Sequence, residues 1–260
     1  MTIRAFQDPH HMNERRLTSP NRRRGHLVFA AIVALATTVG GCLAPRAAEV
    51  SPPREKSVKP GINDPYLTEP VETWVARFEA ESREIYRERE RLTAWIGLKE
   101  GQHVADIGAG TGFFTLLFSR AVGSSGKVYA VDLMPGFVEH IRLLAEHERL
   151  ANVVPVVCKE DSVELAPQSI DVAFICDTYH HFEYPRSTMA SIRSALRPGG
   201  QLIIIDFIRI PGVSRDWILD HVRAGREEVI AEVKSDGFTL IETPDTPYLE
   251  ENYVLRFRKR

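Results

Sequence analysis

The sequence predicts an α/β protein built on a doubly wound, mostly parallel sheet. Between residues 103 and 208, apolar segments of strand length alternate with segments of helix length, as such a sheet requires. The first apolar segment ends in Asp106 and opens into three glycines at alternate positions. The second ends in Asp132, 20 residues after the last of these glycines. These features favour a sheet that binds a ligand at the carboxyl ends of its strands.

The individual elements follow from local patterns. Proline and glycine in residues 197–200 end the last core helix and turn the chain into the fifth strand. Beyond that strand, residues 217–235 are amphipathic, and alternating segments follow at 238–242 and 253–257. The predicted core strands are 103–107, 128–132, 153–158, 170–176 and 201–208, and the predicted core helices are 112–121, 135–150 and 187–196.

The glycine-rich loop after the first strand is the strongest indication of a ligand site. Gly108, Gly110 and Gly112 permit unusual dihedral angles and close approach of a ligand. Their G-x-G-x-G spacing differs from the G-x-G-x-x-G of dinucleotide sites, where helix amides bind a pyrophosphate. The Asp106 carboxylate would repel a pyrophosphate but suits an ammonium or sulfonium group. A tight turn without a ligand is the alternative.

Asp132 is the second acid at the predicted site. A carboxylate at the end of the second strand can accept hydrogen bonds from both hydroxyls of a ribose. The same residue could instead cap the N-terminus of the helix predicted at 135–150.

Over about residues 74–258 the chain resembles the class I S-adenosylmethionine-dependent methyltransferases. The matching segments, in order, are VADIGAGTG, YAVD, KEDS, ICDTYHHF, LRPGGQLIIIDF, DGFTLIET and NYVLRFRKR. The resemblance implies a Rossmann-like, seven-stranded sheet of order 3-2-1-4-5-7-6 whose last strand is antiparallel. In that order two strands separate Cys158 from Cys176, about 14 Å, so no disulfide is expected between them.

The resemblance also implies S-adenosylmethionine as the cofactor and a set of residues that bind it. The glycine loop would contact the methionine part, the end of the second strand the ribose, and the segment after the third strand the adenine amino group. The implied cofactor-binding residues are Asp106, Gly108, Ala109, Gly110, Gly112, Asp132, Leu133, Asp161, Ser162 and Asp177.

The segment after the fourth strand supplies the candidate catalytic residues Asp177, His180 and His181. In the resembled family this position faces the transferring methyl group. Asp177 would lie near the amino group or sulfonium of the cofactor, and either histidine could take a proton from the acceptor. The alternative is that the histidines pack or cap the loop. A zinc site is not expected, because neighbours in an extended segment point apart and no further His or Cys lies at ligand spacing.

Two further groups of residues are candidates for contacts to cofactor or substrate. Residues 71–96 have the pattern of one amphipathic helix, which could cover the cleft as a lid through Phe78, Glu79, Arg83 and Tyr86. Before the last helix and over the edge of the sheet, His221 and Arg223 could contact substrate. An ion pair of this segment with Glu227 is equally plausible.

The first 41 residues have the pattern of a bacterial lipoprotein signal peptide. A basic region is followed by an apolar stretch at 27–39 and by small residues before Cys42, the expected site of lipidation. An uncleaved anchor is the alternative, and the flanking residues fit a twin-arginine signal poorly. Residues 42–70 are rich in proline and predict an extended tether, which leaves 71–260 as the methyltransferase domain.

Composition and these motifs together define the functional expectation. The 260 residues are 43% hydrophobic with a formal net charge of −2, which supports one sizeable core and gives no reason to expect nucleic-acid binding. The chain is expected to be a methyltransferase with a small-molecule acceptor, anchored by lipid on the periplasmic side of a bacterial envelope, with cytoplasmic retention also open. The alternative is a lipid-anchored protein that binds a nucleoside without turnover. An NAD-linked oxidoreductase is disfavoured by the glycine spacing and the C-terminal hairpin.

Overall fold

The computed structural model describes residues 55–260, which contain a seven-stranded sheet of order β3-β2-β1-β4-β5-β7-β6. Strands β1 to β5 pair in parallel, whereas β7 is antiparallel to both β5 and β6. The predicted topology is therefore confirmed. The strands span β1 His103–Ile107, β2 Lys127–Asp132, β3 Val153–Val157, β4 Ile170–Cys176, β5 Leu196–Phe207, β6 Phe238–Glu242 and β7 Asn252–Lys259.

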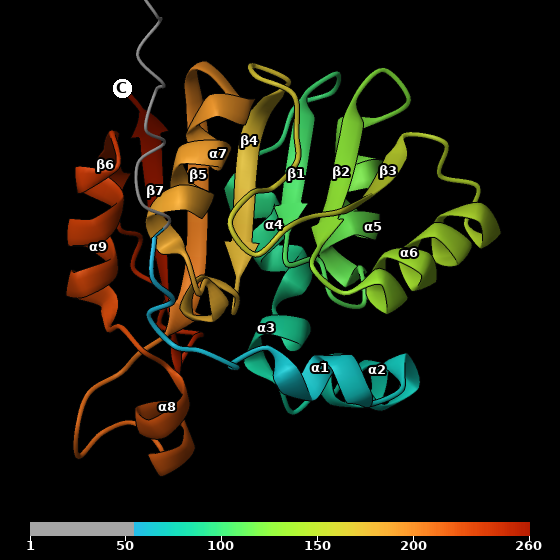
Figure 1. Ribbon diagram of the computed structural model, residues 1–260. Helices are drawn as coiled ribbons and strands as arrows, with labels where there is room; N and C mark the ends of the chain where they lie inside the picture. The colour runs from blue at the N-terminus through green and yellow to red at the C-terminus, as the bar shows by residue number, and fades with distance from the viewer. Residues whose placement is uncertain (1–54) are drawn as a thin grey trace, which may run out of the picture. The chain divides into compact units, whose positions relative to one another are not determined.

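Helices cover both faces of this sheet (Figure 1). Side chains alternate across each strand, so Val104 belongs to the core cluster that includes residues of α4 and α5. Ala105 belongs to the cluster on the other face, which includes residues of α7 and α9. The helices are α1 Asp64–Thr68, α2 Val71–Phe78, α3 Glu84–Arg87, α4 Arg89–Ile96, α5 Phe113–Val122, α6 Pro135–His147, the 3-10 turn η1 Tyr179–His181, α7 Pro185–Ala195, α8 Asp216–His221 and α9 Arg226–Ser235.

The single helix predicted over residues 71–96 is wrong: the segment forms α2, α3 and α4. Tertiary hydrogen bonds compete with helix continuity at the first break. Both carboxylate oxygens of Glu84 accept backbone N–H groups, from Glu250 at 2.6 Å and from Glu251 at 3.0 Å. Arg83 has extended backbone angles and directs its guanidinium to Asp177. The periodic pattern cannot report these contacts, because their partners are distant in sequence.

The tether predicted over residues 42–70 is also wrong for its second half. Residues 55–70 pack on the domain and include α1, and Ile62 is buried. Glu55 accepts the backbone N–H groups of Arg186 and Ser187 at the start of α7, at 3.1 and 2.8 Å. Lys59 Nζ donates to the carbonyl of Asp220 at 2.8 Å. Polar anchors of this kind order a segment that is poor in apolar residues.

The segment predicted as one amphipathic stretch at 217–235 is divided into α8 and α9. Among the described residues, Cys158 and Cys176 are free, and they lie at the ends of β3 and β4 with two strands between them. No helix in residues 55–260 is long and apolar enough to cross a membrane. The predicted signal peptide at 1–41 and the predicted lipidation site Cys42 lie outside the described residues.

Candidate active site

A cavity of about 910 Å³ is lined by residues at the carboxyl ends of the central strands. Helices α1, α2 and α3 lie beside these strand ends (Figure 1). Most of the residues predicted for the site line this cavity. The predicted cofactor and catalytic residues that line it are Asp106, Gly108, Ala109, Gly110, Asp132, Leu133, Asp177, His180 and His181. Of the further candidates, Phe78, Arg83 and His221 also line it, whereas Glu79, Tyr86 and Arg223 do not.

Gly108 and Gly112 lie too close to neighbouring segments to carry a Cβ, and Gly110 contacts the second acid. Gly108 has φ +71°, and a Cβ there would lie 2.2 Å from Thr178 Cγ2, so the loop is packed directly against the segment after β4. Gly110 donates its N–H to Asp132 Oδ2 at 2.8 Å and keeps the loop beside the second acid. Gly112 lies outside the cavity lining and faces α6, where an added Cβ would come within 2.8 Å of Ile141 Cγ1. Close packing against α6 is therefore a reason for glycine at this position that is separate from the predicted cofactor contact.

The two acids of the site are buried and differ in their partners. Asp132 accepts N–H groups from Gly110 and from Met134, the latter at 2.9 Å, and Met134 rather than Asp132 is the N-cap of α6. Burial raises the pKa of Asp132 to about 6, although these N–H donors oppose the shift. Asp106 accepts the Thr115 hydroxyl at 2.6 Å, and burial raises its pKa to about 7. Each acid keeps oxygen lone pairs for a ligand.

The segment after β3 contributes different residues from those predicted. Cys158, Lys159 and Glu160 line the cavity, whereas Asp161 and Ser162 do not. The chain reverses here: Lys159 N–H donates to the Ser162 carbonyl at 2.9 Å, and Ser162 N–H to the Lys159 carbonyl at 3.3 Å. This tight turn moves the KEDS segment away from the cavity after its second residue, which a linear motif does not reveal.

Asp177 lies at the centre of the site but is held by protein groups. Its backbone has φ +48°, its Oδ2 pairs with the Arg83 guanidinium, and its Oδ1 accepts Asn252 Nδ2 at 2.6 Å. Burial raises the pKa of Asp177, and the charge of Arg83 opposes that shift. Asp177 therefore positions Arg83 at the cavity wall, a contact that joins the start of α3 to the end of β4.

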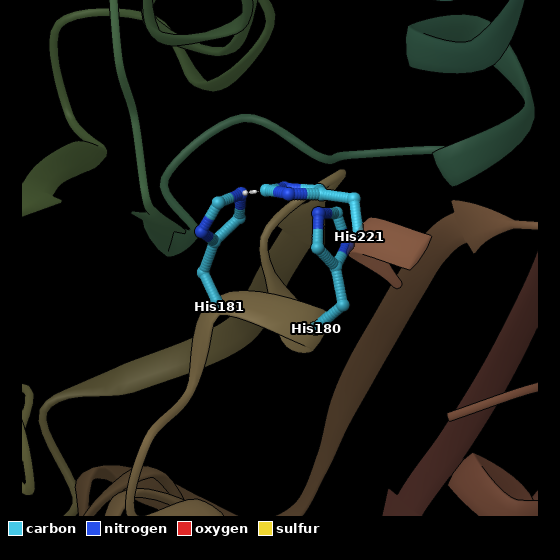
Figure 2. A group of neighbouring side chains, drawn as sticks. All are labelled: His180, His181 and His221. Atoms are coloured by element: carbon cyan, nitrogen blue, oxygen red, sulfur yellow. Dashed lines mark hydrogen bonds between the residues drawn. The ribbon is translucent and has the colours of Figure 1, made fainter. Parts of the chain in front are cut away.

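The two adjacent histidines make different contacts. His180 is buried, and its Nδ1 lies 2.7 Å from Asp206 Oδ1 on β5, so the carboxylate holds the proton on that nitrogen. His181 Nε2 lies 3.4 Å from the Tyr66 hydroxyl and 3.3 Å from His221 Nε2. Figure 2 shows the three rings gathered together, His180 and His181 from η1 and His221 from α8. Burial lowers the pKa of His181 and lowers that of His221 to about 4.

Two expectations about this region are corrected. The argument against a metal site assumed that no further ligand lies near His180 and His181, yet His221 joins them from 40 residues further along the chain. Arg223 does not pair with Glu227; its guanidinium binds both carboxylate oxygens of Glu232 at 2.9 Å. The fold brings these partners together through α8 and α9, so sequence spacing could not identify them.

Aromatic side chains from the N-terminal segment cover one side of the cavity. Tyr66 packs 4.4 Å from Trp74 and 6.4 Å from Phe137 between ring centroids, and Phe78 joins the same cluster. Tyr66 was not among the residues predicted to line the site, because it lies in the segment assigned to the tether. An aromatic residue among the prolines of that segment was the available signal.

Comparison with known proteins agrees with this geometry. Residues 105–204 match a family model described as a methyltransferase domain. Over 112 residues the chain is 30% identical to the ubiquinone/menaquinone biosynthesis C-methyltransferase UbiE of Hahella chejuensis, a match that covers 43% of this chain and 45% of the relative. The chain thus spans about half the length of the curated relatives it matches.

Solved structures share the fold. An S-adenosylmethionine-dependent methyltransferase from Aquifex aeolicus superposes with a TM-score of 0.65 at 24% identity, covering 72% of this chain and 98% of that one. The [4+2]-cyclase SpnF superposes with a TM-score of 0.59 at 16% identity, over 67% and 82% of the two chains. The family model and the fold imply S-adenosylmethionine as the cofactor. The presence of a cyclase among these structures illustrates that a fold of this kind does not by itself specify the reaction.

Proposed function

We propose that this chain is an S-adenosylmethionine-dependent methyltransferase acting on a small-molecule acceptor. The proposal rests on one observation: the glycine loop and Asp132 line the same cavity and are hydrogen-bonded to each other. Gly110 N–H donates to Asp132 Oδ2 at 2.8 Å. The Asp132 carboxylate therefore lies beside a loop that a ligand can approach closely, and the ribose hydroxyls of the cofactor would bind to this carboxylate. The match of residues 105–204 to a methyltransferase domain supports the same cofactor.

The acceptor would occupy the part of the cavity bounded by the aromatic cluster and the histidines. The cavity volume of about 910 Å³ is at the upper end of the usual range for small-molecule sites, enough for a cofactor with a small organic acceptor. An acceptor atom in line with the methyl–sulfur bond would bond to the methyl carbon as that bond breaks and a neutral thioether leaves. The protein would contribute orientation and exclusion of water. His180 is the better placed proton acceptor of the predicted pair, because Asp206 binds its Nδ1 and would stabilise the imidazolium formed when Nε2 takes a proton.

Substitution of Asp132 by alanine tests the cofactor site. We expect titration calorimetry on the purified chain to give micromolar binding of S-adenosylmethionine or its demethylated product. The variant should bind at least tenfold more weakly, about 1.4 kcal/mol, because the two ribose hydroxyls lose their acceptor. Glu139→Ala on the exposed part of α6 is the matched control, since its carboxylate pairs only with Arg142 among the contacts described.

Absence of binding to the wild-type chain would contradict the proposal. Binding without turnover across an acceptor screen would favour the non-catalytic alternative.

We further propose that the chain is a lipid-anchored protein of a bacterial envelope, on the strength of the sequence that ends at Cys42. Replacement of Cys42 by serine should abolish labelling by a fatty-acid precursor and leave the signal peptide uncut in cells. Equal labelling and processing of the variant and the wild type would contradict this proposal, whatever the outcome of the cofactor measurements.

A further inference from the structure

We propose that His180, His181 and His221 form a binding site for a divalent first-row transition metal ion, with Zn²⁺ as the best chemical match. One ring nitrogen from each residue can be chosen so that all three lie within 4.8 Å of one another (Figure 2). Three imidazoles are a ligand set used by catalytic zinc sites, in which the fourth position stays open.

The spacing of two of the nitrogens already suits a shared ion. Zn–N bonds of about 2.0–2.1 Å in a tetrahedral site place ligand nitrogens about 3.3 Å apart. His181 Nε2 and His221 Nε2 are 3.3 Å apart. A ring nitrogen of His180 lies within 4.8 Å of a nitrogen of each of the other two rings. A movement of the His180 ring would bring this third nitrogen to bonding distance from the ion. The change needed is therefore a small adjustment of side chains on η1 and α8.

Asp206 gives the proposed site an outer carboxylate. Its Oδ1 lies 2.7 Å from His180 Nδ1, and its Oδ2 accepts the backbone N–H of His180 at 3.1 Å. A carboxylate that holds the proton on one ring nitrogen leaves the other with a lone pair and orients the ring, as in carboxylate–histidine–zinc arrangements. His180 would thus present Nε2 to the ion from a ring that is almost completely buried.

Burial favours the uncharged form of the other two histidines, because it lowers the pKa of both His181 and His221. A metal ion binds the uncharged imidazole. Within residues 55–260, His181 Nδ1 is buried without a hydrogen-bond partner, whereas its Nε2 faces Tyr66 and His221. The ammonium of Lys59 lies near the site, bound to the carbonyls of Asp220 and His221 at 2.8 and 2.5 Å. The carboxylate of Asp206 offsets that positive charge at the site.

The site lies on the cavity wall, because all three histidines are among its lining residues. An oxygen or sulfur atom of the methyl acceptor could take the open fourth position, a placement that rests on the proposed function. Binding of the ion itself does not depend on it. In the metal-bound protein His180 Nε2 would be a ligand, and it would serve as a proton acceptor only in the metal-free protein.

The test is metal binding by the full chain carrying His10→Ala and His11→Ala, which removes the adjacent histidines near the N-terminus as competing ligands. After chelator treatment, the protein is titrated with Zn²⁺ by calorimetry and with Co²⁺ by visible absorption. We expect one ion per chain and an intense tetrahedral Co²⁺ spectrum. His221→Ala should weaken binding at least tenfold and abolish that spectrum, whereas His147→Ala, with its exposed ring on α6, should change neither.

Circular dichroism checks that His221→Ala is folded, and His221→Asn is a second variant that keeps more of the side-chain volume. No Zn²⁺ binding by the starting protein, or equal binding by the His221 variants and the His147 control, would overturn the proposal. Binding of the demethylated cofactor is measured on the same samples. If that binding is absent while Zn²⁺ still binds through His221, the cofactor proposal fails and the metal site stands.

Discussion

Replacing Gly108 by alanine is expected to lower the free energy of unfolding by about 3 kcal/mol and to abolish cofactor binding. The backbone at Gly108 has φ +71°, a left-handed conformation that costs a residue with a Cβ about 1–2 kcal/mol. The added Cβ would also lie 2.2 Å from Thr178 Cγ2 and 2.8 Å from Thr178 Cβ, and overpacking of this kind costs about 1–3 kcal/mol. Urea unfolding and titration calorimetry measure the two effects.

Gly212→Ala separates the two contributions. Gly212 has φ +79°, and no atom lies within 4 Å of the Cβ that alanine would add, so only the backbone term applies. Its loss of stability should be about 1–2 kcal/mol, with cofactor affinity unchanged. Equal losses in the two variants would show that the approach of Gly108 to Thr178 contributes nothing to stability.

Replacing Arg83 by methionine is expected to have the second large effect, a loss of about 3 kcal/mol in the free energy of unfolding, because it leaves the buried Asp177 carboxylate without its ion-pair partner. Asn252 continues to donate one hydrogen bond to that carboxylate. The exposed ion pairs of Arg142 provide the control, since Arg142→Met should cost much less. A loss for Arg83→Met no larger than for Arg142→Met would contradict this role.

The Arg83→Met defect should depend on pH in a defined direction. Burial already raises the pKa of Asp177, and the charge of Arg83 is the main effect opposing it. Without that charge the folded-state pKa rises further above the unfolded value, so the native state gains stability as it takes up a proton on acidification. The difference from wild type should therefore be smaller at about pH 5 than at about pH 8. Adding Asp177→Asn to Arg83→Met should remove this change with pH.

The local chemistry of the cofactor site could be predicted from the sequence because it lies in short, continuous segments. Asp106 and Asp132 lie in the last two residues of β1 and β2, and the glycines follow β1 directly. Parallel strands bring their carboxyl ends to one edge of the sheet. Gly112 shows the limit of this reasoning. Its place in the motif suggested a cofactor contact, but the packing of α5 against Ile141 of α6 explains the requirement for glycine.

The acceptor side of the site could not be predicted in the same way. Asp206 and His221 join His180 only because β4, β5 and α8 converge at one edge of the sheet. Tyr66 reaches His181 because polar groups such as Glu55 and Lys59 anchor a segment whose composition suggested an extended tether. Contacts between residues so far apart in sequence leave no periodicity or spacing to detect.

The sequence by itself determined the α/β class and the two acids beside the glycine loop, because backbone geometry and strand direction act locally. It determined the strand order through its family resemblance. Only the tertiary structure decided which helices are broken, which charges are paired and which histidines meet. Those outcomes depend on burial and on hydrogen bonds between distant segments, where the cost of leaving a buried polar group without a partner outweighs local helix preference.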